Sequence, residues 1–408
     1  MHGLSLRRLS PVAAVLTLAA CADSAVAPRD RAPVVARGDD GGAAGEAGQP
    51  IPGRYIVVFR DGVPDVRGKA AEMARRAGGE VTQVYERALR GFAGPMSASA
   101  AALLRQDPDV AYVEQDQVVT LDATQTPVPS WGLDRVDQTA LPLSGGYTYE
   151  KTGAGVVAYI IDTGVRATHQ DFGGRATNAF DAVGDGTTVD CNGHGTHVAG
   201  TVGGNTYGVA KGVTIRAIRV FSCSGSSATS TIVSGVDWAV GNHQAGEPAV
   251  ANLSLGGGAS QAMDDAVTRL INDGVFTAVA AGNGNIFGIA QDACNYSPAR
   301  VAAATTVAAT TSTDAKASYS NFGRCVDLYA PGSGITSAWW DGDAAKNTIS
   351  GTSMAAPHVA GVGALYLQGT PSASPATVGS WITNNATSGV VSGNPRRTAN
   401  LLLNKRSL

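Results

Sequence analysis

The sequence predicts an α/β fold: a doubly wound, mostly parallel sheet preceded by a small α+β domain. In the larger, C-terminal part of the chain, apolar runs at residues 155–161, 214–220, 249–255 and 275–281 alternate with helical patterns. Strands that are apolar on both faces and separated by helices are typical of a parallel sheet covered on both sides. A shorter alternation of strand and helix patterns between residues 54 and 121 predicts a separate small domain.

The composition is that of a globular protein and excludes several functional classes. Of the 408 residues, 44% are hydrophobic and 15% are charged, which is too apolar for a largely disordered chain. The formal net charge is −3, so the chain has no basic field to bind nucleic acid or an anionic membrane. The 52 glycines follow no G-X-Y period, which indicates many tight turns rather than a fibre.

The N-terminus has the pattern of an export signal. Arg7 and Arg8 precede an apolar run over residues 12–20, about half the length of a membrane-spanning helix. We therefore assign residues 1–21 to a signal peptide and expect a secreted, extracellular protein. The run ends in Leu-Ala-Ala-Cys, which resembles the sequence at which bacteria attach lipid to a cysteine, here Cys21, so the precursor could be lipid-anchored. Cleavage after Ala22 without a lipid anchor is the alternative.

A linker and a small domain follow the signal. Residues 22–50 are rich in Ala, Gly, Asp, Arg and Pro, so we expect a disordered linker. We assign residues 51–122 to the small domain, which is close to the lower size limit for independent stability. Its expected strands cover residues 55–59, 81–85, 91–95 and 110–113, and its expected helices cover residues 69–77 and 98–105.

Residues 123–408 form the expected large domain, with amphipathic helices over residues 231–242 and 262–273 between its strands. In such sheets, ligands bind beyond the carboxyl ends of the strands. Apart from Cys21, the cysteines of the chain are Cys191, Cys223, Cys294 and Cys325. An even number in an exported protein predicts two disulfides. The residues alone leave all three pairings open.

Two segments carry acid–base side chains. Asp162 ends an apolar strand and is followed by Gly164, although an isolated aspartate at this place is often only a turn cap. His194 lies between two glycines at the start of a helical pattern, so its imidazole is approachable. Cys191, His194 and His197 could instead ligate zinc, but no second Cys or His pair lies nearby.

Two further segments carry an amide and a hydroxyl. Asn283 follows a strand and is either an oxyanion donor or an ordinary turn former. Ser353 begins a long apolar helix, where serine also serves as a cap. Ala355 replaces the second glycine of the Gly-X-Ser-X-Gly motif, so the α/β-hydrolase elbow is not matched. Aspartate, histidine and serine follow one another along this chain in the same order as the catalytic residues of subtilisin.

Four blocks resemble the signatures of subtilisin-like serine proteases, the subtilases: residues 162–164, 194–200, 280–283 and 351–358. Residues 131–135, 190–192 and 293–298 narrow the resemblance to the proteinase K branch, most nearly to the aqualysin type of bacterial enzyme. The resemblance covers residues 123–408 and implies a subtilisin-like fold for them. Residues 54–121 are similar to the inhibitory propeptide of these enzymes, which implies a ferredoxin-like α+β domain.

The resemblance implies a secreted serine endopeptidase that is made as a zymogen. Ser353 is then the nucleophile, His194 its base, Asp162 the carboxylate that orients the base, and Asn283 an oxyanion donor, with no catalytic metal. An esterase and an inactive peptide-binding protein are the alternatives. The chemical groups are all present, however, and an inhibitory propeptide with glycine-rich strand edges suits protein substrates better.

The family pattern also implies how substrates bind. An extended peptide would pair with two backbone edges, which favours protein or peptide substrates of broad sequence. The primary pocket would be walled by small uncharged groups and would prefer apolar or aromatic side chains. The implied binding residues are Ser224, Gly225, Ser226, Ser254, Leu255, Gly256, Ala280, Ala281 and Gly282.

The resemblance further implies structural calcium and a specific maturation. Asp327 with the carbonyls of Ala302 and Ala304 would form one calcium site, and Asp134, Asp137 and Gln138 resemble a second. Autocleavage is expected between Asp122 and Ala123, with the propeptide as an intramolecular inhibitor and a monomeric enzyme as the product. The family pairs Cys191 with Cys223 and Cys294 with Cys325, and a Ser297–Pro298 peptide bond is expected to be cis.

Overall fold

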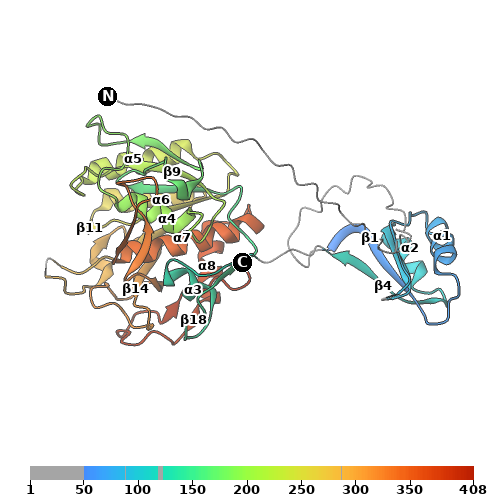
Figure 1. The fold of residues 1–408 in the computed structure, drawn as a ribbon. Coiled ribbons are helices and arrows are strands. Elements are labelled where there is room, and N and C mark those ends of the chain that lie inside the picture. Colours follow the sequence, from blue (N-terminus) through green and yellow to red (C-terminus); the bar gives the residue numbers. More distant parts are fainter. Residues whose placement is uncertain (1–49, 88, 118–122, 286) are drawn as a thin grey trace, which may run out of the picture. The chain divides into compact units, whose positions relative to one another are not determined.

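The computed structural model describes residues 50–87, 89–117, 123–285 and 287–408. These residues form two compact units, divided within residues 118–122 (Figure 1). The predicted signal peptide, Cys21 and Asp122 lie outside the described residues, as does the linker except Pro50. None of the described helices is long and apolar enough to cross a membrane.

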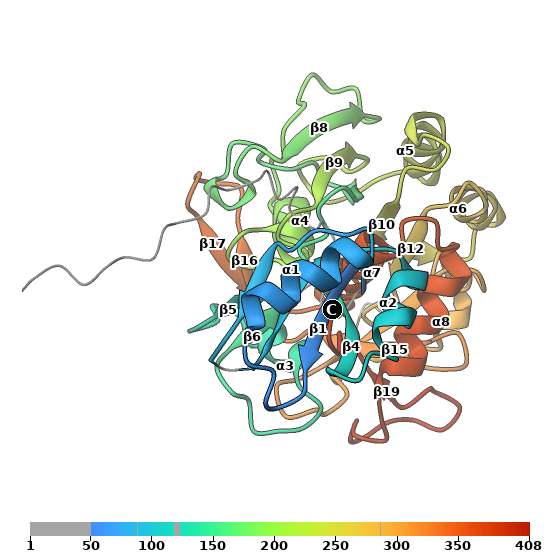
Figure 2. The same ribbon diagram turned by 90° about the vertical axis from the view of Figure 1, so that its right-hand side faces the viewer.

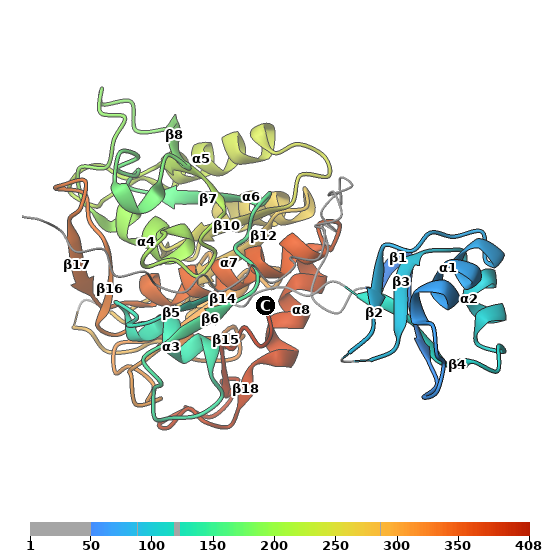
Figure 3. The same ribbon diagram turned by 45° about the vertical axis from the view of Figure 1, so that its right-hand side comes forward.

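The first unit has the ferredoxin-like order of elements, with a four-stranded antiparallel sheet in the order β2-β3-β1-β4. Figure 3 shows α1 and α2 on one face of this sheet. Phe92 and Met73 are fully buried in one hydrophobic core of this unit. Asp65 and Ser97 cap the two helices. The elements are β1 Pro50–Phe59, α1 Val66–Arg76, β2 Gln83–Tyr85, β3 Gly91–Pro95, α2 Ala98–Leu104 and β4 Val110–Gln117.

The first strand begins earlier than the sequence pattern predicts. Pro50 was assigned to the linker, but it pairs with Gln117 across an irregularity in the β1–β4 ladder. The prediction was wrong at this residue because the pairing depends on a partner strand far along the chain.

The second unit contains a nine-stranded sheet in the order β18-β19-β15-β14-β12-β10-β7-β9-β8. All neighbouring strands in it are parallel except β18 and β19. Its strands are β7 Val157–Asp162, β8 Ala176–Asp181, β9 Thr214–Arg219, β10 Ala249–Leu253, β12 Phe276–Ala280, β14 Thr305–Thr310, β15 Leu328–Pro331, β18 Thr387–Ser388 and β19 Leu401–Leu402. The helices are α3 Trp131–Asp137, α4 His194–Gly203, α5 Thr229–Asn242, α6 Gln261–Asn272, α7 Thr352–Gly369 and α8 Pro375–Asn385.

Short two-stranded ladders surround this sheet. They pair β5 Ala123–Gln125 with β6 Tyr147–Tyr149, β11 Gly257–Gly258 with β13 Tyr296–Ser297, and β16 Ile335–Ala338 with β17 Lys346–Ile349. Single 3-10 turns lie at η1 Gln170–Phe172 and η2 Ala293–Asn295.

Helices cover both faces of the large sheet (Figure 2). Along β7, Tyr159 and Ile161 face a core formed with α5 and α6, whereas Ala158 and Ile160 face a core formed with α4, α7 and α8. All six residues of β7 are buried. The alternation of side chains along a strand therefore supplies two apolar faces at once, as the apolar run predicts.

The strand order reverses beside β7, which has β9 on one side and β10 on the other. The chain therefore leaves the carboxyl ends of β7 and β10 in opposite directions, and a crevice forms there. Asp162 ends β7, Ser254 follows β10, and Asn283 follows β12 closely.

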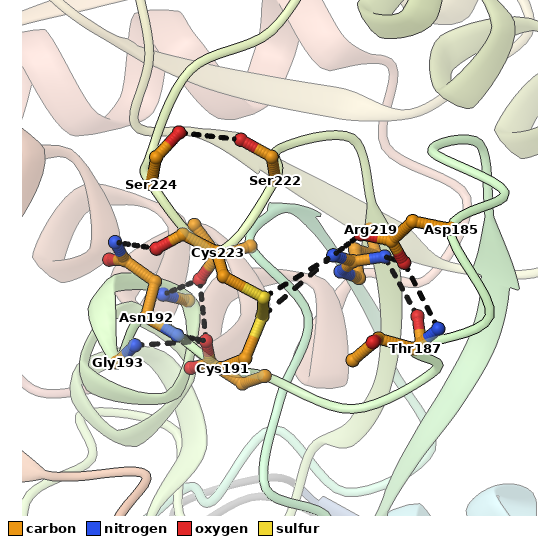
Figure 4. The surroundings of a disulfide bond; sticks show 12 residues. Asp185, Thr187, Cys191, Asn192, Gly193, Arg219, Ser222, Cys223 and Ser224 are labelled. Carbon is orange, nitrogen blue, oxygen red and sulfur yellow. Dashed lines mark hydrogen bonds and ion pairs between the residues drawn. A yellow bond between two sulfur atoms is a disulfide. The ribbon is translucent and has the colours of Figure 1, made fainter.

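Both disulfides have the pairing that the resemblance implies, Cys191–Cys223 and Cys294–Cys325. Cys191 is therefore not available as a zinc ligand. Next to the first disulfide, the buried guanidinium of Arg219 donates to Asp185 at 2.7 Å and to the carbonyl of Thr187 at 2.7 Å (Figure 4). The Ser297–Pro298 bond is cis, as expected.

Candidate active site

The carboxylate of Asp162 contacts the imidazole of His194. Asp162 Oδ1 lies 2.8 Å from His194 Nδ1 and also accepts the N–H of Thr163 at 2.8 Å. Gly193 precedes α4 with φ 108° and packs against two tryptophan rings so closely that a Cβ would lie 2.5 Å from them. Glycine is therefore required at the turn that delivers the histidine to the carboxylate.

The charge of Asp162 controls the protonation of His194. Burial disfavours the charged imidazole, but the charge and hydrogen bond of Asp162, together with the charge of Asp190, outweigh it and raise the pKa of His194 above 6.5. The side chain of His194 remains 28% exposed. The ring is thus held through Nδ1 while the rest of it stays open to a ligand.

Asp190 organises the segment between Asp162 and His194, and the sequence patterns did not identify this role. Its Oδ1 accepts from Thr163 Oγ1 and from the N–H of Gly193, both at 2.9 Å. Its Oδ2 accepts the N–H of Thr196 at 2.9 Å. Asp190 lies within the motif that contains His194, but a motif does not show which atoms a carboxylate will reach.

Ser353 lies in the first turn of α7 and lines a cavity together with Asp162 and His194. This cavity has a volume of about 420 Å³, and Asp162, His194, Asn283 and Ser353 all line it. Ser353 Oγ donates to the carbonyl of Ser254 at 3.3 Å, while Ser254 Oγ donates to the carbonyl of Ser353 at 2.7 Å. The nucleophile candidate must therefore exchange this acceptor for His194, an adjustment that catalytic hydrogen bonds commonly make when substrate binds.

Thr352 fixes the orientation of the Asn283 amide. Asn283 Oδ1 accepts both the N–H of Thr352 at 2.8 Å and its hydroxyl at 2.9 Å. Both bonds use the oxygen, so the Nδ2 donors are left for another acceptor. Ser353 is the second residue of α7, and N–H groups in the first turn of a helix have no acceptor within the helix. These donors suit a developing negative charge.

The structure brings together most of the predicted substrate-binding residues. Ser224 and Ser226 do not line the cavity but flank Gly225, which does. The other predicted residues all line it: Ser254, Leu255, Gly256, Ala280, Ala281 and Gly282.

Asn321 supports the pocket floor and was also not identified from sequence. Its side chain donates to the carbonyl of Ala281 at 2.9 Å and accepts the N–H groups of Gly284 and Gln291 at 3.0 and 2.8 Å. Forty residues separate it from Ala281, so no local pattern could show this contact.

Asp327 provides a chemically suitable place for a cation. Asp327, Ala302 and Ala304 line one surface hollow. Burial raises the pKa of Asp327 to about 6, although the N–H of Thr306, which Asp327 Oδ2 accepts at 2.7 Å, opposes this rise. A carboxylate of this kind with nearby carbonyl oxygens fits a hard cation such as calcium.

The residues of the second predicted calcium set are bound to other protein groups. Asp137 pairs with Lys405 at 3.0 Å and accepts the N–H of Thr148 at 2.8 Å. Asp134 accepts the N–H and the hydroxyl of Ser144 at 3.2 and 3.0 Å. Lys405 offsets the charge of Asp137, hydrogen-bond donors occupy oxygens of both carboxylates, and Gln138 accepts the N–H of Ser144 as well. Among the described residues, no group of three or more His, Cys, Asp or Glu could hold a metal.

The fold and the site define a class: enzymes with a doubly wound sheet and aspartate, histidine and serine side chains around one crevice. The sequence model of the subtilase family matches residues 153–400, and the model of the peptidase inhibitor I9 family matches residues 54–122. The chain belongs to the subtilase family and is a serine protease.

Individual relatives agree with this assignment. The chain is 53% identical over 379 residues to the extracellular serine proteinase of Thermus sp. strain Rt41A, covering 88% of this chain and 90% of that protein. It is 49% identical over 370 residues to alkaline serine exoprotease A of Vibrio alginolyticus, and the match covers 86% of this chain and 67% of that protein. The crystal structure of a cold-adapted subtilisin-like serine proteinase matches with a TM-score of 0.65 and 52% identity, covering 69% of this chain and 99% of that one.

Proposed function

We propose that the chain is a secreted serine endopeptidase of broad specificity that matures by cleaving itself. The observation that supports this most strongly is the cavity in which Asp162 holds His194 at 2.8 Å while Ser353 and the Asn283 amide line the same space.

In the proposed reaction, Ser353 Oγ attacks the carbonyl carbon of the scissile peptide while His194 Nε2 takes the hydroxyl proton. The carbonyl oxygen gains negative charge, which Asn283 Nδ2 and the N–H of Ser353 stabilise. The C–N bond then breaks, and His194 gives its proton to the leaving amine. A water molecule, activated by the same histidine, hydrolyses the resulting ester and restores Ser353.

The lining of the cavity supports broad, apolar-biased specificity. Ala280, Ala281 and Gly282 offer neither bulk nor charge, so this wall of the cavity provides no carboxylate for a basic side chain. Main-chain groups near Gly225 and Gly256 would pair with an extended peptide, which gives affinity with little sequence preference.

The inhibitor-like first unit supports synthesis as a zymogen. We propose that residues 51–122 inhibit the enzyme within the same chain and are removed by cleavage between Asp122 and Ala123. The Thermus relative is named extracellular, which together with the N-terminal pattern supports secretion; we further propose that the mature enzyme is a monomer. The names of the relatives give no support to a lipid anchor at Cys21.

We propose structural calcium at one place only, with Asp327 and the carbonyls of Ala302 and Ala304 as protein ligands. A bound ion would compensate the buried carboxylate and stabilise the loop before β14. This role is separate from the chemistry of Ser353.

Two assays test the proposed function. Purified wild-type enzyme should hydrolyse casein, a serine-directed inhibitor should abolish the activity, and N-terminal sequencing should find Ala123-Thr124-Gln125. Ser353→Ala should remain full length and inactive. An active enzyme that retains residues of the 51–122 segment would refute the proposed maturation.

A further inference from the structure

The turn after the cavity carries two strongly exposed apolar side chains. Phe287 is 78% exposed, more than any other large apolar side chain in the described part of the chain, and Ile289 is 60% exposed. Single exposed apolar residues are common on protein surfaces. Two of them on one short turn beside a reaction cavity form a candidate interaction surface.

The base of this turn is anchored to the cavity. Asn321 binds the N–H groups of both Gly284 and Gln291, where the turn begins and ends. Gln291 also accepts the N–H of Phe322 at 3.0 Å through its carbonyl. The turn is therefore fixed to Asn321 at both of its ends.

Asn285 contacts the described residues at the tip of the turn. Its Oδ1 accepts the N–H groups of Phe287 and Ile289 at 3.0 and 3.2 Å, and its own N–H donates to the carbonyl of Ile289 at 2.9 Å. The N–H of Gly288 donates to the carbonyl of Asn285 at 2.8 Å. Because backbone groups and the Asn285 side chain make these bonds, the two apolar side chains are presented outward without being needed to hold the turn together.

The turn also folds back onto the rim. Gly284 lines the cavity and has φ +84°, and a Cβ on it would lie 2.6 Å from the carbonyl oxygen of Ile289. Phe287 and Ile289 do not line the cavity themselves. They therefore lie next to the rim but outside the space that a single substrate side chain would fill.

We propose that Phe287 and Ile289 form an accessory binding surface for apolar side chains of polypeptide substrates, outside the residues that enter the cavity. This inference rests on the proposed function. A polypeptide bound in the crevice must continue past its rim, and the surface is continuous with that rim through Gly284. Residues 283–291 carry no charge, so the recognition would be apolar and insensitive to salt.

The test compares a protein with a short peptide as substrates for the mature enzyme. Phe287→Ser and Ile289→Ser, together and separately, are assayed on unfolded casein and on a tetrapeptide anilide. We expect KM for casein to rise about tenfold in the double variant, with kcat within about twofold of wild type, because apolar contact is lost. Hydrolysis of the anilide should be unchanged.

Leu141→Ser is the matched control, since Leu141 is an exposed apolar residue (40%) in the loop between α3 and β6. It should leave both substrates unaffected. Equal losses on casein and the anilide, no loss on either, or the same loss in Leu141→Ser would overturn the proposal. The proposal would also be overturned if the variants differed from the wild type only in their retention on an octyl chromatography matrix. That result would indicate an exposed apolar surface that does not contact the substrate. A wild-type enzyme that fails on the anilide would instead count against the proposed function.

Discussion

At the scale of residues, His194 and Asn283 are each held by the atom that does not take part in the proposed reaction. His194 is bound through Nδ1 to Asp162, which leaves Nε2 for the proton of Ser353. Asn283 is bound through Oδ1 to Thr352, which leaves Nδ2 for the oxyanion. Such support sets tautomer and orientation before substrate arrives, and preorganised donors need little rearrangement during the reaction.

The first prediction concerns pH. A protonated His194 cannot accept the proton of Ser353, so activity is lost as pH falls through the pKa of His194, which lies above 6.5. The ascending limb of kcat/KM on a peptide anilide, measured from about pH 5 to 9, should report this pKa. Asp162→Asn should lower the pKa and reduce kcat by roughly 10⁴, the magnitude found in other serine proteases. If the ascending limb of kcat/KM lies at the same pH in Asp162→Asn as in the wild type, Asp162 does not set the pKa of His194.

The second prediction separates the two residues of the oxyanion site. Asn283→Leu removes the donor and should lower kcat by roughly 10² to 10³, a magnitude known from subtilisin, with little change in KM. Thr352→Val removes only the hydroxyl that orients the amide and should lower kcat by about threefold to tenfold. Equal effects of both variants on steady-state kinetics would argue against a positioning role for Thr352.

At the scale of elements, the sequence was sufficient where a pattern is local. Buried strands such as β7 and β10 are recognisable from apolar runs, and α5 and α6 from their periodicity. The loops that support the site are different. Asn321 reaches Ala281 across the fold, and Lys405 neutralises Asp137 from the last residues of the chain. Those contacts depend on the tertiary structure, so the sequence could not show that protein groups bind the carboxylates of the second calcium set.

The third prediction concerns the disulfide beside the substrate edge. Cys191 and Cys223 are 32 residues apart, so replacing both with Ser should cost roughly 3 to 4 kcal/mol in the chain-entropy model. Cys223 precedes the edge that contains Gly225, so KM for peptides should also rise. Denaturant unfolding of inhibitor-blocked enzyme gives the stability change.

Cys294 and Cys325 provide the control, because their separation of 31 residues predicts a similar entropic cost. Their replacement leaves the edge at Gly225 in place. If both double variants change KM equally, the edge is not specifically supported by the first disulfide.

At the scale of the whole molecule, one sheet collects side chains from distant segments. Asp162 and Asn283 are 121 residues apart in the chain, and Asn283 and Ser353 are 70 apart, but all three line one cavity. The reversal of strand order beside β7 creates that cavity, and helices on both faces keep the sheet buried. Stability of this unit is therefore a condition for the geometry of the site.

The fourth prediction tests calcium as a contribution to that stability. A chelator should lower the unfolding temperature of the inhibitor-blocked enzyme, because the buried Asp327 carboxylate loses its compensating ion. Asp327→Asn should unfold at a lower temperature than the calcium-loaded wild type and should be indifferent to chelator. A chelator effect that persists in Asp327→Asn would place the stabilising ion elsewhere.

We propose that Ser353 is the nucleophile and that its reactivity depends on His194. Labelling with a sulfonyl fluoride followed by peptide mapping distinguishes the nucleophile from every other serine. One adduct is expected, on the peptide that contains Ser353, with strongly reduced labelling in His194→Ala and none in Ser353→Ala. An adduct on another residue, or casein hydrolysis retained by Ser353→Ala, would show that Ser353 is not the nucleophile.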